Sequence, residues 1–208
     1  MIVLCLIRIQ SETTVNKMNY KEQNKNMACP WARFYASPEH AALEYPEGTM
    51  YDVFRESALA NPECTAIDYM GIKISYKKLH AHVLRCADAL CKIGAKQGDR
   101  ITVCLPNIPQ AVIVFYAIIY IGAEANMIHP LSAGNEIEFF VNKSKSTFLF
   151  IFDAFFGKTD NINCPTLKKI IFAGAADMLP FYMRAGFHMT QGRQIKRPAE
   201  SETVLSWT

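Results

Sequence analysis

Apolar residues recur at intervals of three and four between residues 76 and 93, and this spacing predicts a long helix with one buried face. Ser75 precedes the pattern as an N-cap and Gly94 ends it. A second helix is predicted from Thr49, its cap, to the stop at Asn61 and Pro62. The residues that define the long helix are Tyr76, Leu79, Val83, Cys86, Leu90 and Ile93.

Two short runs rich in strand-forming residues lie between these helices. Thr65–Tyr69 and Ile72–Ser75 flank the dipeptide Met70-Gly71, which is the spacing of a two-residue β-hairpin. We therefore expect an antiparallel hairpin before the long helix.

Four continuous apolar runs predict buried strands at residues 101–105, 124–128, 147–152 and 167–172. Helical patterns at 110–121 and 135–142 separate the first three runs. Strands that alternate with helices form βαβ crossovers, so the fold class expected is α/β, with a mostly parallel sheet and helices on both faces. We expect this α/β subdomain to occupy residues 49–180. A tail and irregular segment at 1–48 precede it, and an extension at 181–208 follows it.

Composition and charge exclude several classes of protein. Half of the 208 residues are hydrophobic and 20% are charged, which is typical of a globular chain. The formal charge of +3 comes with no basic stripe, and Arg193, Lys196 and Arg197 read as a solvated turn, so no nucleic-acid partner is expected.

The cysteines and apolar segments indicate a cytoplasmic protein. Seven cysteines lack the spacing of a zinc site or a disulfide framework, and we expect no metal site. The opening segment, residues 1–7, lacks the flanks of a signal peptide. The longest apolar run, residues 111–123, is shorter than the ~20 residues that cross a bilayer, so no transmembrane segment is expected.

Loops at the carboxyl ends of the predicted strands are the places to search for chemistry, because open α/β sheets bind ligands there. His129 follows the second strand, where it could act as a base, line a ligand cleft, or only bond the backbone of a turn. Asp153 could bind a ribose hydroxyl or a cation, or could cap a turn. Residues 156–159 resemble the end of a phosphate-binding loop but lack its first glycine.

Other titratable side chains give no catalytic arrangement. His80 and His82 are two positions apart on a helix, so they do not share a face, and both are expected at the surface. We assign no catalytic residue.

Several short motifs, taken in order, resemble one enzyme family. Residues 74–79 resemble its "(L/F)TYxEL" segment, and Gly98-Asp99-Arg100 resembles its "GDRV" entry to a strand. Residues 106–110 resemble "PNxxE" with Gln110 near the glutamate, and residues 121–131 resemble "K(I/L)GAVxNxxNPL" with His129 at a common asparagine. By these motifs the chain is similar to the N-terminal part of the AMP-forming acyl-CoA synthetases, within the acyl-adenylate-forming ligases.

This resemblance implies a two-step reaction. A carboxylic acid attacks ATP to form an acyl-adenylate, and the thiol of coenzyme A then displaces AMP. The full-length family uses ATP, Mg²⁺ and CoA. Asn107, His129 and Pro130 would lie on the substrate side of the cleft, and the setting would be fatty acid metabolism.

The family's phosphate loop, "YTSGTTGxPKG", and its C-terminal lysine do not occur in these 208 residues. We therefore expect an N-terminal fragment that is inactive alone, binds no cofactor by itself and self-associates through exposed apolar surface. The alternative is a non-catalytic binding or interaction module that keeps the fold.

Overall fold

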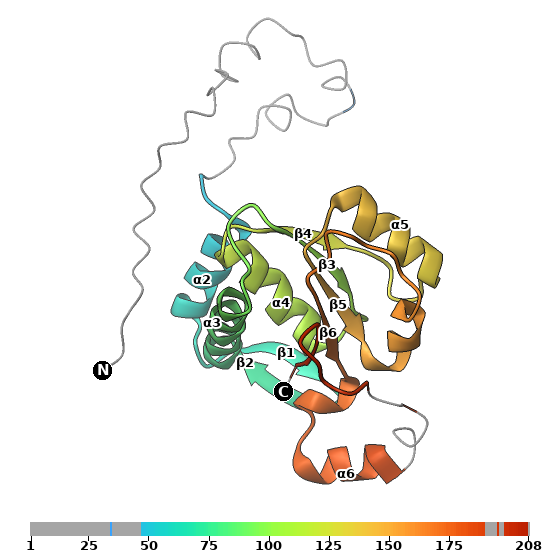
Figure 1. Cartoon of the computed structure of the whole chain (residues 1–208). Helices are drawn as coiled ribbons and strands as arrows, with labels where there is room; N and C mark the ends of the chain where they lie inside the picture. The colour runs from blue at the N-terminus through green and yellow to red at the C-terminus, as the bar shows by residue number, and fades with distance from the viewer. Residues whose placement is uncertain (1–33, 35–46, 190–194, 196–197, 208) are drawn as a thin grey trace, which may run out of the picture. The chain divides into compact units, whose positions relative to one another are not determined.

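The computed structural model of the protein describes residues 34, 47–189, 195 and 198–207. The chain divides into two compact units, Met1–Glu47 and Gly48–Thr208. The second unit contains every helix and strand discussed below (Figure 1). The predicted tail, except for residues 34, 47 and 48, and the three basic residues Arg193, Lys196 and Arg197 lie outside the described residues.

The first helix, α2 (Met50–Ala60), begins at the predicted cap. The backbone N–H of Asp52 donates to the Thr49 hydroxyl at 3.2 Å, and the Thr49 backbone N–H donates to the Asp52 carboxylate at 2.9 Å. This reciprocal pair is a capping box, which satisfies two N–H groups that the first turn would otherwise leave unpaired.

The predicted hairpin is present as β1 (Thr65–Tyr69) and β2 (Ile72–Ser75), paired antiparallel with Tyr69 opposite Ile72. Its two turn residues, Met70 and Gly71, both have positive φ angles, of 52° and 81°. Glycine adopts this conformation freely, whereas methionine does so at a cost.

The long helix is α3 (Tyr76–Lys92), and the Ser75 hydroxyl accepts a hydrogen bond from the Lys78 N–H at 3.4 Å. Its buried residues are Leu79, Val83, Ala87 and Leu90, which confirms the predicted face.

A five-stranded parallel sheet forms the centre of the unit, in the order β4-β3-β5-β6-β7. The predicted α/β fold with a parallel sheet is confirmed. The fifth strand, β7, was not predicted from the sequence because it has only three residues and depends on its pairing with β6, Ile170 opposite Val204. The strands are β3 (Arg100–Cys104), β4 (Glu124–Met127), β5 (Phe148–Phe152), β6 (Lys169–Ala173) and β7 (Val204–Ser206).

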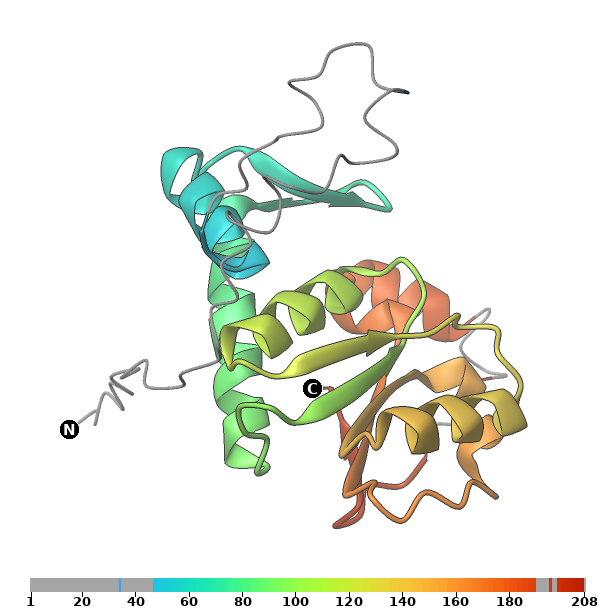
Figure 2. The ribbon, with the colours of Figure 1, turned by 90° about the horizontal axis from the view of Figure 1, so that it is seen from above.

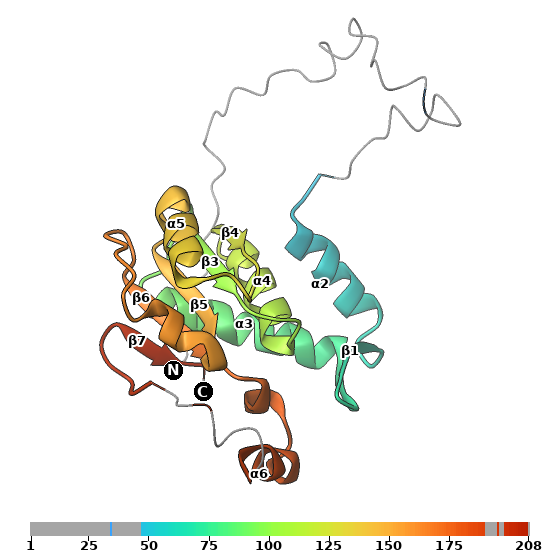
Figure 3. The same ribbon diagram turned by 90° about the vertical axis from the view of Figure 1, so that its right-hand side faces the viewer.

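Helices cover both faces of this sheet (Figures 2 and 3). Alternate strand residues, such as Val103 and Phe150, pack with α2, α3 and α4 (Pro109–Tyr120). Residues of the opposite parity, such as Cys104 and Leu149, pack with α5 (Gly134–Ser144). The remaining helices are the 3₁₀ segments η3 (Asp153–Thr159) and η4 (Ala175–Met178) and the α-helix α6 (Phe181–Met189).

Four polar side chains form a ring of hydrogen bonds at the β3–β4 side of the sheet, beside the end of α5. The Thr102 and Ser146 hydroxyls are 2.7 Å apart, and so are those of Ser144 and Ser146. The Asn126 amide donates to Thr102 at 3.0 Å and to Ser144 at 3.1 Å. Because Thr102 and Ser146 are fully buried, these bonds offset the cost of removing the hydroxyls from water.

The structure corrects the expectation that His80 and His82 lie at the surface, because both are partly buried. His80 has the clearer setting. Its ring is partly buried among aromatic side chains of α2, with Nε2 2.9 Å from the Tyr51 hydroxyl and the ring centroid 5.9 Å from that of Phe54. The neighbouring helix α2 covers the position, which the helical spacing of His80 and His82 alone could not reveal.

Candidate substrate cleft

The ends of β3 and its two neighbours form a topological switch point. The chain leaves β3 toward α4 on one face of the sheet, whereas it leaves β4 and β5 toward α5 and η3 on the other. Connections that diverge in this way leave a crevice at the carboxyl edge, which is where open α/β sheets bind ligands.

Asn107 lies in the loop after β3 and is exposed. The next two residues, Ile108 and Pro109, are buried, so the loop is held against the core while the Asn107 side chain faces outward. Within residues 47–189, 195 and 198–207 its amide has no side-chain hydrogen-bond partner. The amide can therefore donate to, or accept from, a ligand.

His129 and Pro130 lie in the loop after β4, and the end of β3 fixes this loop. The Cys104 thiol donates to the carbonyl of His129 at 3.6 Å and to that of Pro130 at 3.9 Å. These two predicted residues therefore lie against the strand whose exit loop contains Asn107. Among the described residues, the Asn107 and His129 side chains form no hydrogen bond with each other.

The imidazole of His129 is oriented by its own loop. Its Nδ1 atom accepts a hydrogen bond from the backbone N–H of Leu131 at 3.2 Å. A backbone N–H can only donate, so the neutral ring has its proton on Nε2. The ring thus bonds the turn, as one interpretation of the sequence expected, and still offers Nε2–H to another group.

His129 also lines an open groove beside β4, with a volume of about 500 Å³. The carboxylate of Glu136, at the start of α5, lies in this groove and accepts from the Ala133 N–H at 2.9 Å. Asn107 and Pro130 do not line it. The groove residues are Asn126, Met127, Ile128, His129, Leu131, Ser132, Glu136 and Phe140.

Two further residues shape this edge without having been predicted as site residues. Gln110 is fully buried, and its amide donates to the carbonyl of Gly174, after β6, at 2.7 Å. Lys158, in η3, donates from Nζ to the carbonyls of Leu131 at 3.2 Å and Ser132 at 2.8 Å. The sequence signal for Lys158 was its echo of a phosphate-binding loop, but the structure places it in a 3₁₀ helix with carbonyl partners.

Asp153 is the first residue of η3 and is 4% exposed. Among the described residues, no three side chains of His, Cys, Asp or Glu come close enough together to hold a metal ion. The donor atoms of the described residues therefore do not fit a protein-bound metal ion.

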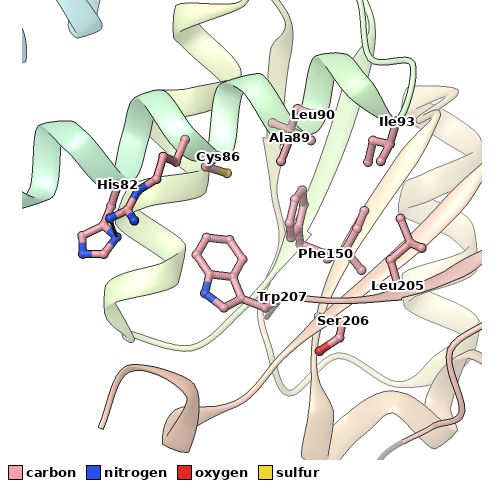
Figure 4. A pocket seen from close by; sticks show the side chains of 11 residues that line it. His82, Cys86, Ala89, Leu90, Ile93, Phe150, Leu205, Ser206 and Trp207 are labelled. Carbon is pink, nitrogen blue, oxygen red and sulfur yellow. Dashed lines mark hydrogen bonds between the residues drawn. The ribbon is translucent and has the colours of Figure 1, made fainter. Parts of the chain in front are cut away.

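A second, smaller groove lies away from the β3 and β4 exit loops, between α3 and the strands β5, β6 and β7 (Figure 4). Its volume is about 270 Å³, and its walls include Leu90, Phe150 and Trp207. Burial raises the pKa of the Cys86 thiol in this wall to about 12, so Cys86 is not a reactive thiolate. The Arg85 guanidinium donates to Nδ1 of His82 at 3.1 Å at the groove's edge.

Comparisons with known proteins point to one family. The family described as "AMP-binding enzyme" matches residues 54–195. A long-chain-fatty-acid–CoA ligase of Bacillus subtilis (strain 168) is 28% identical over 169 residues, which cover 80% of this chain and 30% of that protein. A 2,3-dihydroxybenzoate-AMP ligase of the same organism is 31% identical over 136 residues, covering 62% of this chain and 25% of that protein.

Solved structures agree on the fold. The crystal structure of coronafacic acid ligase from Pectobacterium brasiliense aligns with a TM-score of 0.61 and 21% identity, covering 76% of this chain and 28% of that chain. The chain thus spans less than a third of the length of each of these relatives.

Proposed function

The chain belongs to the AMP-binding enzyme family, and from this premise we propose that it forms the N-terminal part of an AMP-forming acyl-CoA synthetase. The observation that supports this most strongly is the family match over residues 54–195, which includes the strands β3 to β6 and both exit loops described above. In the complete reaction a carboxylic acid and ATP give an acyl-adenylate and pyrophosphate, and CoA then takes the acyl group.

In this proposal Asn107, His129 and Pro130 contribute to the substrate side of the cleft. The exposed Asn107 amide and the Nε2–H of His129 can bond oxygen atoms of a carboxylic acid. Pro130 limits the backbone of the loop that holds the imidazole. We assign no acyl chain length, because proteins similar to this chain include a long-chain-fatty-acid–CoA ligase and an acetyl-coenzyme A synthetase of Candida albicans.

We propose further that these 208 residues alone do not catalyse adenylation. The chemistry needs donors for the triphosphate and a positive charge for the transition state, and the sequence contains neither the phosphate loop nor the lysine that the family uses for these tasks. ATP, Mg²⁺ and CoA would act only with those parts present.

Carboxylate-dependent exchange of labelled pyrophosphate into ATP tests this point. Acetate, octanoate and palmitate are supplied in turn to the purified chain, and the Bacillus subtilis long-chain ligase serves as the active control. We expect no exchange above the background without carboxylate. Exchange that depends on any of the three acids would overturn the proposed inactivity.

The alternative function is a binding or interaction module that keeps the fold without the reaction. Reading the coding sequence beyond codon 208 separates the two proposals. A phosphate-loop sequence in any frame supports the synthetase, whereas unrelated sequence favours the module.

We also propose a cytoplasmic location and a role in fatty acid metabolism. The five cysteines that the structure describes are thiols, the form that a reducing compartment maintains. Over that same part of the chain, the structure has no helix with the length and apolarity needed to cross a bilayer. Fractionation of cells that express a tagged chain tests the location.

A further inference from the structure

Four consecutive backbone carbonyls, those of residues 129–132, accept hydrogen bonds from two side chains. The Cys104 thiol binds the first two carbonyls at 3.6 and 3.9 Å, and the Lys158 ammonium binds the last two at 3.2 and 2.8 Å. A thiol is a weak donor, whereas an ammonium group forms charge-assisted bonds. Lys158 is therefore the stronger of the two anchors of this loop.

Lys158 is itself held in place. Its Nζ atom lies 4.4 Å from the centroid of the Phe155 ring, a cation–π contact. Its backbone lies close to the start of α5, since a Cβ atom added to Gly134 would lie only 2.7 Å from the Lys158 carbonyl oxygen. The glycine at 134 thus allows η3 and the start of α5 to approach this closely. Lys158 forms no ion pair with a described residue, so its charge is directed at the loop carbonyls.

Leu131 connects this anchor to the imidazole. Its carbonyl accepts from Lys158, and its N–H donates to Nδ1 of His129 at 3.2 Å. If the loop moved, that N–H would no longer face the ring, and the ring could rotate or change tautomer. In the neutral imidazole, the hydrogen bond to Nδ1 keeps the ring proton on Nε2.

We propose that Lys158 is a positioning residue, which holds the loop 129–132 so that His129 presents Nε2–H as a fixed hydrogen-bond donor beside the β4 groove. The acceptor it would serve is a carboxylate oxygen, and only this last point rests on the function proposed above. Fixing the donor before the substrate binds lowers the ordering cost of binding.

The test uses the full 208-residue chain with ¹⁵N-labelled histidine and ¹⁵N-labelled leucine, at mildly alkaline pH. In the unmodified chain we expect ring nitrogen shifts of the Nε2–H tautomer and a protected Leu131 amide. Lys158→Met should give a mixture of tautomers and make the Leu131 amide exchange about tenfold faster, since charge-assisted bonds to the loop are lost.

Two variants control for charge and for folding. Lys143→Met removes a lysine of α5 that also lies over a ring, 5.4 Å from the centroid of Phe139, and it should leave both signals unchanged. Lys158→Arg keeps a charged donor and should retain the Nε2–H tautomer. The far-ultraviolet circular dichroism of every variant is compared with that of the unmodified chain.

The inference is overturned if folded Lys158→Met keeps the tautomer and the Leu131 exchange rate of the unmodified chain, or if Lys143→Met changes them equally. Octanoate is then titrated as the probe of the acceptor. A shift of the His129 Nε2–H signal that weakens in Lys158→Met supports the carboxylate assignment. A fixed tautomer without any octanoate response would support the role of Lys158 and count against the proposed substrate role.

Discussion

The side-chain amide of Gln110 donates a 2.7 Å hydrogen bond to the backbone carbonyl of Gly174, which joins the start of α4 to the residue after β6. Gln110 is fully buried, and its Oε1 atom has no hydrogen-bond partner among the described residues. The Gln110 amide is therefore a buried polar group whose one hydrogen bond among the described residues links α4 to the loop after β6.

Replacing the amide donor of Gln110 should lower the stability of the fold. Gln110→Glu places a carboxylate beside the Gly174 carbonyl, and we expect the free energy of unfolding at pH 7 to fall by about 1–3 kcal/mol. The loss should shrink as the pH falls, because the protonated carboxyl of the variant can donate again. Urea unfolding at pH 7 and pH 5 measures both effects. The exposed Gln97→Glu is the matched control, and an equal loss in that variant would contradict the explanation.

The close approach of Gly134 to Lys158 predicts that alanine destabilises the fold at position 134 but not at position 186. Gly134→Ala places a Cβ atom 2.7 Å from the Lys158 carbonyl oxygen, which forces η3 away from α5. We expect a loss of about 1–3 kcal/mol in unfolding free energy. Gly186→Ala, in α6, meets no atom within 4 Å and should stabilise the helix by about 0.5–1 kcal/mol. Equal changes in the free energy of unfolding for the two variants, measured with urea, would contradict this explanation.

The capping box of α2 predicts a pH dependence. Hydrogen bonds from the backbone and the side chain of Thr49 lower the pKa of Asp52 below its usual value. A lowered folded-state pKa adds stability above the unfolded-state pKa, and that stability is lost as the pH falls through the folded value. Asp52→Ala should therefore lower the melting temperature at pH 7, and by progressively less as the pH is lowered through the folded-state pKa of Asp52. Glu56→Ala, in the same helix, should show no such pH dependence. The same pH dependence in both variants would contradict the role of the capping box.

Exposed apolar side chains near β4 and α5 predict self-association. Met127, Leu131 and Phe139 are each at least half exposed, and the partly exposed Phe140 lies in the same region. We expect strong binding of a hydrophobic dye and an elution volume that changes with protein concentration. Leu131→Gln together with Phe139→Gln should reduce both, whereas Leu59→Gln, also exposed but in α2, should not. If the chain stays monomeric at all concentrations and does not bind the dye, the prediction is wrong.

The periodic elements of the fold could be predicted from sequence, and the elements fixed by tertiary pairing could not. α3 has apolar residues at helical spacing over 17 residues, and β5 is a continuous run of five apolar residues, so both follow from side-chain burial. β7 has three residues and no pattern of its own.

The candidate site divides in the same way. Asn107 and His129 were predicted because they directly follow strands. Lys158 was missed as an anchor because its partner Ser132 is 26 residues earlier, and only the packing of η3 against α5 brings the two together. A buried amide such as Gln110 gives no signal in a helix that is otherwise apolar.

The polar set of Thr102, Asn126, Ser144 and Ser146 restricts how the sheet can assemble. Side chains in a strand alternate between faces, so a slip of β4 by one residue would turn the Asn126 amide to the apolar face of α4 and leave the buried Thr102 hydroxyl with one partner fewer. Misaligned pairings of β3 and β4 are thereby penalised during folding, and the two loops at the candidate cleft reach the same edge of the sheet in one alignment only.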